Sequence, residues 1–230
     1  MTYTELIAAI QSYTENTFPA TELASGSTVS ATEQLNLFIT QAERRIYNTV
    51  QFPALRKNVT GSTTGGNKYL SCPSDFLAAY SMAVVDGTGA YEFLLNKDVN
   101  YIRAAYPSPA DTGMPKYYAL FGPRSDNEDE LTFIMGPTPN AAYVVELHYF
   151  YYPESITVAA DGRTWLGDNF DSVLLYGALV EAYTFMKGEA DLLALYDGKY
   201  KEALAMAKRL GDGMERGDAY RNGQVKVPVT

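Results

Sequence analysis

The stretch SATEQLNLFITQAERRIYNTVQFPALR, residues 30–56, predicts a long helix and the point where the chain leaves it. Ser30 and Glu33 have the spacing of a capping box, in which each side chain satisfies a free backbone N–H of the first turn. Pro53 ends the helix because it has no backbone N–H to donate. Apolar residues follow the helical period at Leu35, Phe38, Ile39, Ala42, Ile46 and Val50. The residues expected to face solvent are Gln34, Gln41, Glu43, Arg44 and Asn48.

A shorter helix is predicted before this one. Thr2 and Glu5 form another capping box, and apolar residues recur at helical spacing as far as Tyr13. The polar stretch from Thr21 to Ser30 contains glycine, serine and threonine, which indicates a loop. The N-terminus has neither a basic region nor an uninterrupted apolar run, so we expect no signal peptide.

From about residue 56 to residue 156 the pattern changes to short β-prone runs separated by turn residues. Two segments predict hairpin turns, DGTG at residues 86–89 and PTPN at residues 137–140. A short helix is expected from Asn96 or Asp98 to Ala105. The candidate strands are 57–62, 68–71, 78–85, 91–95, 116–121, 131–135 and 143–152.

After Pro153 the chain returns to a helical pattern. Asp168 or Asn169 is expected to cap a helix that reaches Phe185, and its wide apolar face predicts the buried centre of a bundle. A second long helix is expected over residues 189–216.

The last residues have no helical period. Three valines alternate with lysine and proline as in a strand, and a free apolar strand needs a partner in its own sheet or in another chain. The candidate partner-binding residues are Tyr220, Arg221, Val225, Val227 and Val229.

These elements predict an α+β fold in which N- and C-terminal helices form a bundle and an antiparallel β lobe is inserted between them. We expect the helical lobe to comprise residues 1–55 and 160–216 and the β lobe residues 56–159. Residues 217–230 are expected to form an extended tail.

Composition excludes several classes of protein. The 230 residues include 27 acidic and 18 basic side chains, for a net charge of −9, and no basic cluster suits a duplex-DNA binder. One cysteine and one histidine cannot form an internal disulfide or the usual zinc site. No apolar run is long enough to span a membrane. We expect no catalytic, cofactor-binding or metal-binding residues.

Four features of the sequence are candidate sites of chemistry. His148 is expected to be an ordinary strand residue beside Glu146, and Cys72 a passive buried thiol. The acidic run at residues 126–130 indicates a solvated hairpin tip. Trp165, near Asp161 and Asp168, is the patch most like a sugar site, although a packing role is favoured. The alternative function is therefore that of a carbohydrate-binding or other β-type binding module.

An ordered set of motifs gives a more specific indication. They are QAERRIY (41–47), FPALR (52–56), YLSCPSDF (69–76), YFYYP (149–153) and WL (165–166) leading into LLYGALVEA (174–182). In this order and spacing the chain resembles, over residues 1–216, the head–tail adaptor proteins of tailed bacteriophages, the family that includes tail tubular protein A.

The resemblance implies a virion structural protein of the neck or tail, assembled in the cytoplasm of the bacterial host. Proteins of this family form a ring, typically a dodecamer, beneath the portal protein and above the next tail component, a nozzle or tail tube. DNA passes through the ring during ejection without specific binding. The resemblance implies no enzyme activity, no cofactor and no contact with a membrane.

Overall fold

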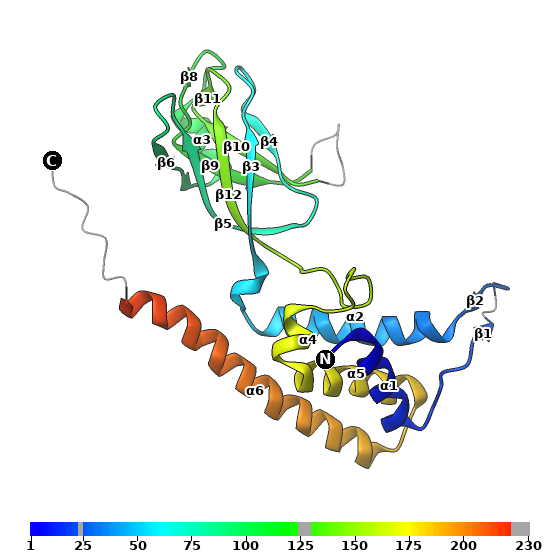
Figure 1. The fold of residues 1–230 in the computed structure, drawn as a ribbon. Helices are drawn as coiled ribbons and strands as arrows, with labels where there is room; N and C mark the ends of the chain where they lie inside the picture. The colour runs from blue at the N-terminus through cyan, green and yellow to red at the C-terminus, as the bar shows by residue number, and fades with distance from the viewer. Residues whose placement is uncertain (23–24, 124–129, 222–230) are drawn as a thin grey trace. The chain divides into compact units, whose positions relative to one another are not determined.

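The computed structural model describes residues 1–22, 25–123 and 130–221, and the side chains of its last helix as far as Gly211. The chain divides into two compact units. Unit 1 consists of Met1–Ala54 and Pro153–Thr230, and unit 2 consists of Leu55–Tyr152 (Figure 1). Helices dominate unit 1 and strands dominate unit 2, so the predicted α+β class is confirmed.

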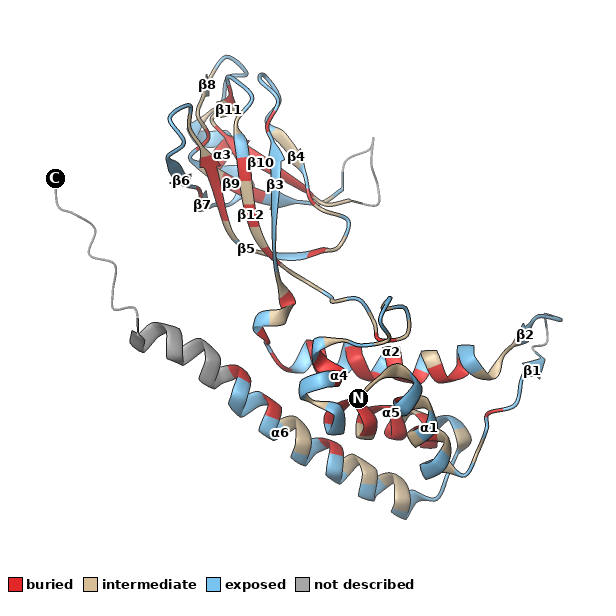
Figure 2. Cartoon of the chain, in the orientation of Figure 1, coloured by how far each residue is buried: buried red, intermediate tan, exposed pale blue. Residues whose placement is uncertain are grey.

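Unit 1 is a bundle centred on one helix. Its helices are α1 (Tyr3–Thr14), α2 (Ala31–Thr49), α4 (Trp165–Asn169), α5 (Asp171–Met186) and α6 (Ala190–Arg221). Helix α5 packs against each of the other four. It has buried residues on all sides, including Leu174, Ala178 and Leu179, as Figure 2 shows. The prediction that this helix forms the centre of a bundle is therefore confirmed.

Both capping boxes are present. Thr2 accepts from the backbone N–H of Glu5, and the Glu5 carboxylate accepts from that of Thr2. Ser30 and Glu33 make the same pair of bonds at the start of α2. Pro53 follows the end of α2 and begins a short 3₁₀ helix, η1 (Pro53–Leu55).

Two residues of α2 that were expected to face solvent are buried, so this part of the prediction is wrong. Gln34 is 5% exposed, and its amide Nε2 donates to the carbonyl oxygen of Pro19 at 3.0 Å. Glu43 is 2% exposed and accepts from the backbone N–H of Ile156 at 3.0 Å. The non-helical segments around Pro19 and Ile156 pack against α2 at these two positions. The helical period of α2 does not predict such contacts.

Three further features of unit 1 differ from the predictions, two helix boundaries and one loop. Phe170, rather than Asp168 or Asn169, is the N-cap of α5, and it makes no side-chain cap bond. Helix α6 ends at Arg221 rather than at residue 216. The predicted loop before α2 contains two short paired strands, β1 (Thr21–Glu22) and β2 (Thr28–Val29).

Unit 2 contains two four-stranded sheets. The first is antiparallel, with the order β3 (Arg56–Ser62), β12 (Val144–Tyr151), β5 (Phe76–Val85) and β6 (Tyr91–Phe93). The second has the order β4 (Tyr69–Ser71), β10 (Thr132–Gly136), β9 (Tyr117–Phe121) and β7 (Leu95–Asn96), with β7 parallel to β9.

One hydrophobic core joins the inner faces of these sheets. Phe76 and Tyr149 from the first sheet stack with ring centroids 5.8 Å apart, and Phe133 from the second meets Phe76 edge-on at 5.3 Å. Helix α3 (Val99–Ala105) packs against β9 and β10, where Ile102 forms a smaller core with Ala119 and Ile134. Unit 2 therefore has three layers, with the second sheet between the first sheet and α3.

Of the two predicted hairpin turns, the one at residues 86–89 is confirmed and the one at residues 137–140 is wrong. Residues 86–89 join the antiparallel strands β5 and β6, and the Asp86 carboxylate accepts from the N–H groups of Thr88 and Ala90. Residues 137–140 are not a hairpin turn, because β10 and β12 belong to different sheets. This segment instead forms β11 (Thr138–Pro139), which pairs in parallel with β8 (Thr112–Gly113).

Candidate functional site

His148 lies on the outer face of the first sheet of unit 2, with its side chain 43% exposed. Its ring Nδ1 is 3.4 Å from the hydroxyl of Ser81, and its Nε2 is 3.9 Å from the carboxylate of Glu146. Both distances exceed those between an activated nucleophile and its general base, about 2.6–3.2 Å. His148 is thus a polar strand residue, as the sequence indicated.

Cys72 is 3% exposed, and burial raises the pKa of its thiol to about 12. A thiol with so high a pKa carries almost no thiolate at neutral pH and is a poor nucleophile. The prediction of a passive buried cysteine is therefore confirmed.

Trp165 belongs to an aromatic cluster in unit 1. Its ring centroid lies 5.1 Å from that of Phe52 and 5.4 Å from that of Phe170, and 37% of the residue is exposed. The nearby carboxylate of Asp168 accepts from the Nε of Arg163 at 3.1 Å and lies 3.8 Å from the N-terminal amine of Met1. Packing accounts for the tryptophan, and local cations neutralise the carboxylate.

The candidate partner-binding residues lie at the end of the described chain. Tyr220 and Arg221 are in the last turn of α6 rather than in an extended tail. Val225, Val227 and Val229 lie outside the described residues, as does the acidic run except for its last member, Glu130.

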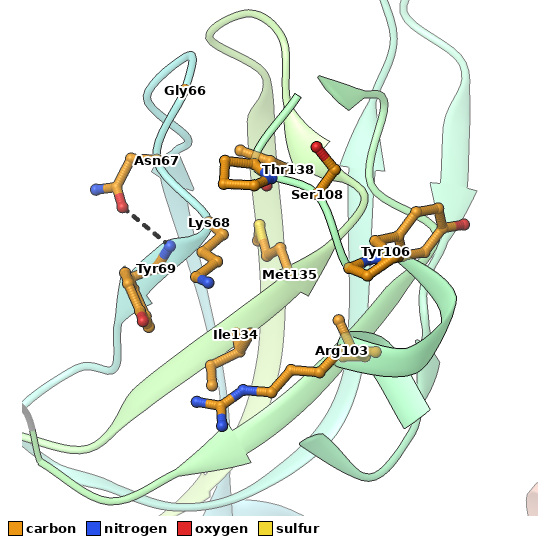
Figure 3. A pocket seen from close by; sticks show the side chains of 13 residues that line it. Gly66, Asn67, Lys68, Tyr69, Arg103, Tyr106, Ser108, Ile134, Met135 and Thr138 are labelled. Carbon is orange, nitrogen blue, oxygen red and sulfur yellow. Dashed lines mark hydrogen bonds between the residues drawn. The ribbon is translucent and has the colours of Figure 1, made fainter. Parts of the chain in front are cut away.

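A cleft of about 200 Å³ opens in unit 2 between α3, β4 and β10 (Figure 3). Ile134 and Met135 of β10 contribute apolar side chains to it, and two cationic side chains join them, Lys68 from the residue before β4 and Arg103 from α3. Within the described residues neither cation forms an ion pair with a carboxylate. Two cations beside an apolar surface suit an anionic group with an apolar body. The sequence analysis did not identify this cleft, since its residues come from separate segments.

A second cavity in unit 2, of about 250 Å³, is predominantly apolar. It lies where β3 of the first sheet approaches β4 of the second, and Cys72 is among its lining residues. The sequence offered one indication of it, a glycine at position 61 within a predicted strand, because glycine inside a strand leaves space beside the backbone.

No cluster of three or more histidine, cysteine, aspartate or glutamate side chains that would suit a metal ion occurs among the residues described. Over the same part of the chain, every helix is too short or too polar to cross a bilayer.

The chain was also compared with known proteins. The model of the SU10 adaptor protein family matches residues 1–227, which include both units. No curated protein matches the sequence.

Proposed function

The chain belongs to the SU10 adaptor protein family, and on that basis we propose that it forms a ring beneath the portal of a tailed phage and joins the capsid vertex to the tail. Members of this family are phage virion proteins with a structural role, so the chain is an adaptor and not an enzyme. The portal, the next tail component (a nozzle or tail tube) and further copies of the chain, as a dodecamer, are its proposed partners.

The observation that carries this proposal is the extent of the family match, which runs through both units. An adaptor needs a surface for the portal side and another for the tail side. A helical unit and a β unit, each with its own core, supply two surfaces of different kinds. The net charge of −9 also favours DNA passage without specific binding, because like charges repel.

The direct test is to mix the full chain with purified portal rings of its own virus and to measure the mass by native mass spectrometry. We expect a complex with about one adaptor for each portal subunit. A mixture in which both proteins are folded and remain separate would contradict the proposal. Portal rings from an unrelated phage provide the control for nonspecific association.

We further propose that the C-terminal tail contributes to assembly through Val225, Val227 and Val229, with Tyr220 and Arg221 beside it. The support is the alternation of these valines with Lys226 and Pro228, which suits a strand that pairs with another chain. Assembly takes place in the host cytoplasm, and the finished ring lies in the neck of the virion.

A chain that ends at Arg221 tests the role of the tail, since it keeps the whole of α6. We expect its melting temperature to equal that of the full chain and its self-association to be weaker, as measured by calorimetry and light scattering. A substantially lower melting temperature of the dilute monomer would instead show that the tail stabilises its own subunit.

A further inference from the structure

Strand β3 is an exposed edge of the first sheet in unit 2. Among the described residues it pairs with β12 alone, and the sheet order ends with it. Six of its seven residues are exposed, and Figure 2 shows the strand in pale blue over most of its length. Alternate N–H and C=O groups of such an edge face away from the sheet, where they can pair with a strand from another chain.

The apolar cavity of about 250 Å³ lies directly beside this edge. On β12, Val145 and Leu147 are buried, and the register places Gly61 and Val59 of β3 opposite them. Residues opposite each other in an antiparallel pair share one face of the sheet, so Val59 and Gly61 face the core side. The other apolar residues that line the cavity are Leu70 and Cys72.

Gly61 contributes to this open space. A Cβ atom built on Gly61 meets no other atom within 4 Å. The edge therefore combines free backbone groups with an adjoining apolar hollow that its own side chains do not fill. Its size suits apolar side chains, because an engineered protein cavity of roughly 150 Å³ binds benzene.

We propose that residues 225–229 of a neighbouring copy add a strand to β3 and place valine side chains in this cavity. The inference rests on the proposed ring and names the surface that accepts the tail. A donor segment and an acceptor edge at different places on one subunit make a head-to-tail contact, which closes into a ring when the rotation between copies permits.

The chemistry of the tail fits this edge. In a strand of residues 225–229, the three valines point to one face, and Lys226 and Pro228 point to the other. The backbone N–H and C=O groups of successive residues also alternate between the two edges of the strand. When the backbone groups of the valines pair with β3, position 228 is therefore directed to the outer edge, where proline has no N–H to offer. Proline is tolerated in an edge strand in that orientation, and it prevents a further strand from adding.

Filling the cavity tests the acceptor side. Gly61→Leu places a side chain in open space, so the monomer should keep its melting temperature while the tail is excluded. We expect self-association, measured by analytical ultracentrifugation, to weaken by about tenfold or more. Thr60→Leu adds the same side chain on the opposite face and should leave association within about twofold of the wild type. Equal association of a folded Gly61→Leu variant and the wild type would overturn the inference.

Cross-linking identifies the chain that supplies the tail. In a Cys72→Ser background, which removes the single cysteine, Val59→Cys is introduced in one population and Val227→Cys in another of different mass. Oxidation of the mixture should give a disulfide-linked heterodimer, and Thr60→Cys in place of Val59→Cys should give far less. If the double variant Val59→Cys/Val227→Cys forms its disulfide only within one chain, the tail binds its own subunit and the inference is wrong.

Two proline variants separate this inference from the proposed function. Val227→Pro removes an N–H that pairs with β3 and should abolish ring formation, whereas Lys226→Pro removes one that faces outward and should not. If wild-type chains form rings on the portal and both variants do so equally well, the strand contact alone is wrong. If wild-type chains form neither rings nor portal complexes, both the contact and the adaptor ring are wrong.

Discussion

Glu43 is a buried carboxyl group whose hydrogen bond connects α2 to the segment before α4. Its side chain accepts from the backbone N–H of Ile156, and Glu43→Ala would leave that buried donor without a partner. We expect the free energy of unfolding to fall by about 1–3 kcal/mol, measured by urea denaturation. Gln41→Ala, on the exposed side of the same helix, should change the free energy by no more than about 0.5 kcal/mol.

The dependence of stability on pH follows from the direction of the pKa shift at Glu43. Burial raises the pKa of the Glu43 carboxyl, so the folded protein binds this proton more readily than the unfolded chain. Its contribution to stability is complete below the unfolded pKa and is lost as the pH rises through the folded pKa. Glu43→Gln keeps an acceptor oxygen without the charge. We therefore expect this variant to gain stability relative to the wild type between acidic and neutral pH, and a constant difference would contradict the assignment.

The error at Gln34 and Glu43 has a physical explanation. The prediction assigned polar residues of the helix to its solvent-facing side, and both side chains are polar. Each is buried because it bonds to the backbone of an irregular segment, at Pro19 and at Ile156, and such partners leave no periodic pattern. Cys72 was easier to predict, because burial is the main cause of the raised pKa of its thiol.

At the scale of elements, Gly177 of α5 lies where this helix approaches both α2 and α6 closely. A Cβ atom there would lie 3.2 Å from the Cβ of Ala42 on α2 and 3.2 Å from a ring carbon of Tyr200 on α6. Gly177→Leu would force these helices apart, and we expect it to destabilise the protein by about 1–3 kcal/mol in thermal or urea unfolding.

Gly198 provides the matched control in α6. A Cβ atom at this position meets nothing within 4 Å, so Gly198→Leu replaces a flexible glycine with a better helix former and causes no clash. We expect a gain of about 0.5 kcal/mol or more from helix propensity. If both leucine variants changed stability by the same amount, packing at Gly177 would not be the reason for its glycine.

The sequence predicted the position of most strands but not their partners. Alternating apolar residues and turn residues located β5, β9, β10 and β12, because these signals are local. The segment at residues 137–140 has the composition of a hairpin turn, yet it leads from one sheet to the other. Sheet membership depends on the shared core around Phe76, Phe133 and Tyr149, which forms only in three dimensions.

At the scale of the whole molecule, unit 2 is a continuous segment with neighbouring ends. Arg56 at the start of β3 pairs with Phe150 near the end of β12, so the chain enters and leaves through adjacent strands. Because unit 2 has its own core, we expect residues 55–152 to fold alone with a cooperative urea transition and native-like near-UV circular dichroism.

The complementary variant replaces residues 56–151 with a short glycine–serine linker. Unit 1 should retain its helical circular dichroism, because α5 packs against α1, α2, α4 and α6, all of which belong to unit 1. Loss of folding in either piece would show that the two units depend on each other. The sequence could predict such an insertion from its order of elements, whereas ring formation needs contacts between chains that no single sequence displays.

Trp165 is an intrinsic fluorescent probe of the helical unit. It is the single tryptophan, and it lies against Phe52 and Phe170 inside the helical unit. Its emission therefore reports the surroundings of α4 and α5, because the aromatic residues of unit 2 are all tyrosine or phenylalanine. A shift in the wavelength of tryptophan emission from the purified protein would therefore report a rearrangement of the bundle without any added dye.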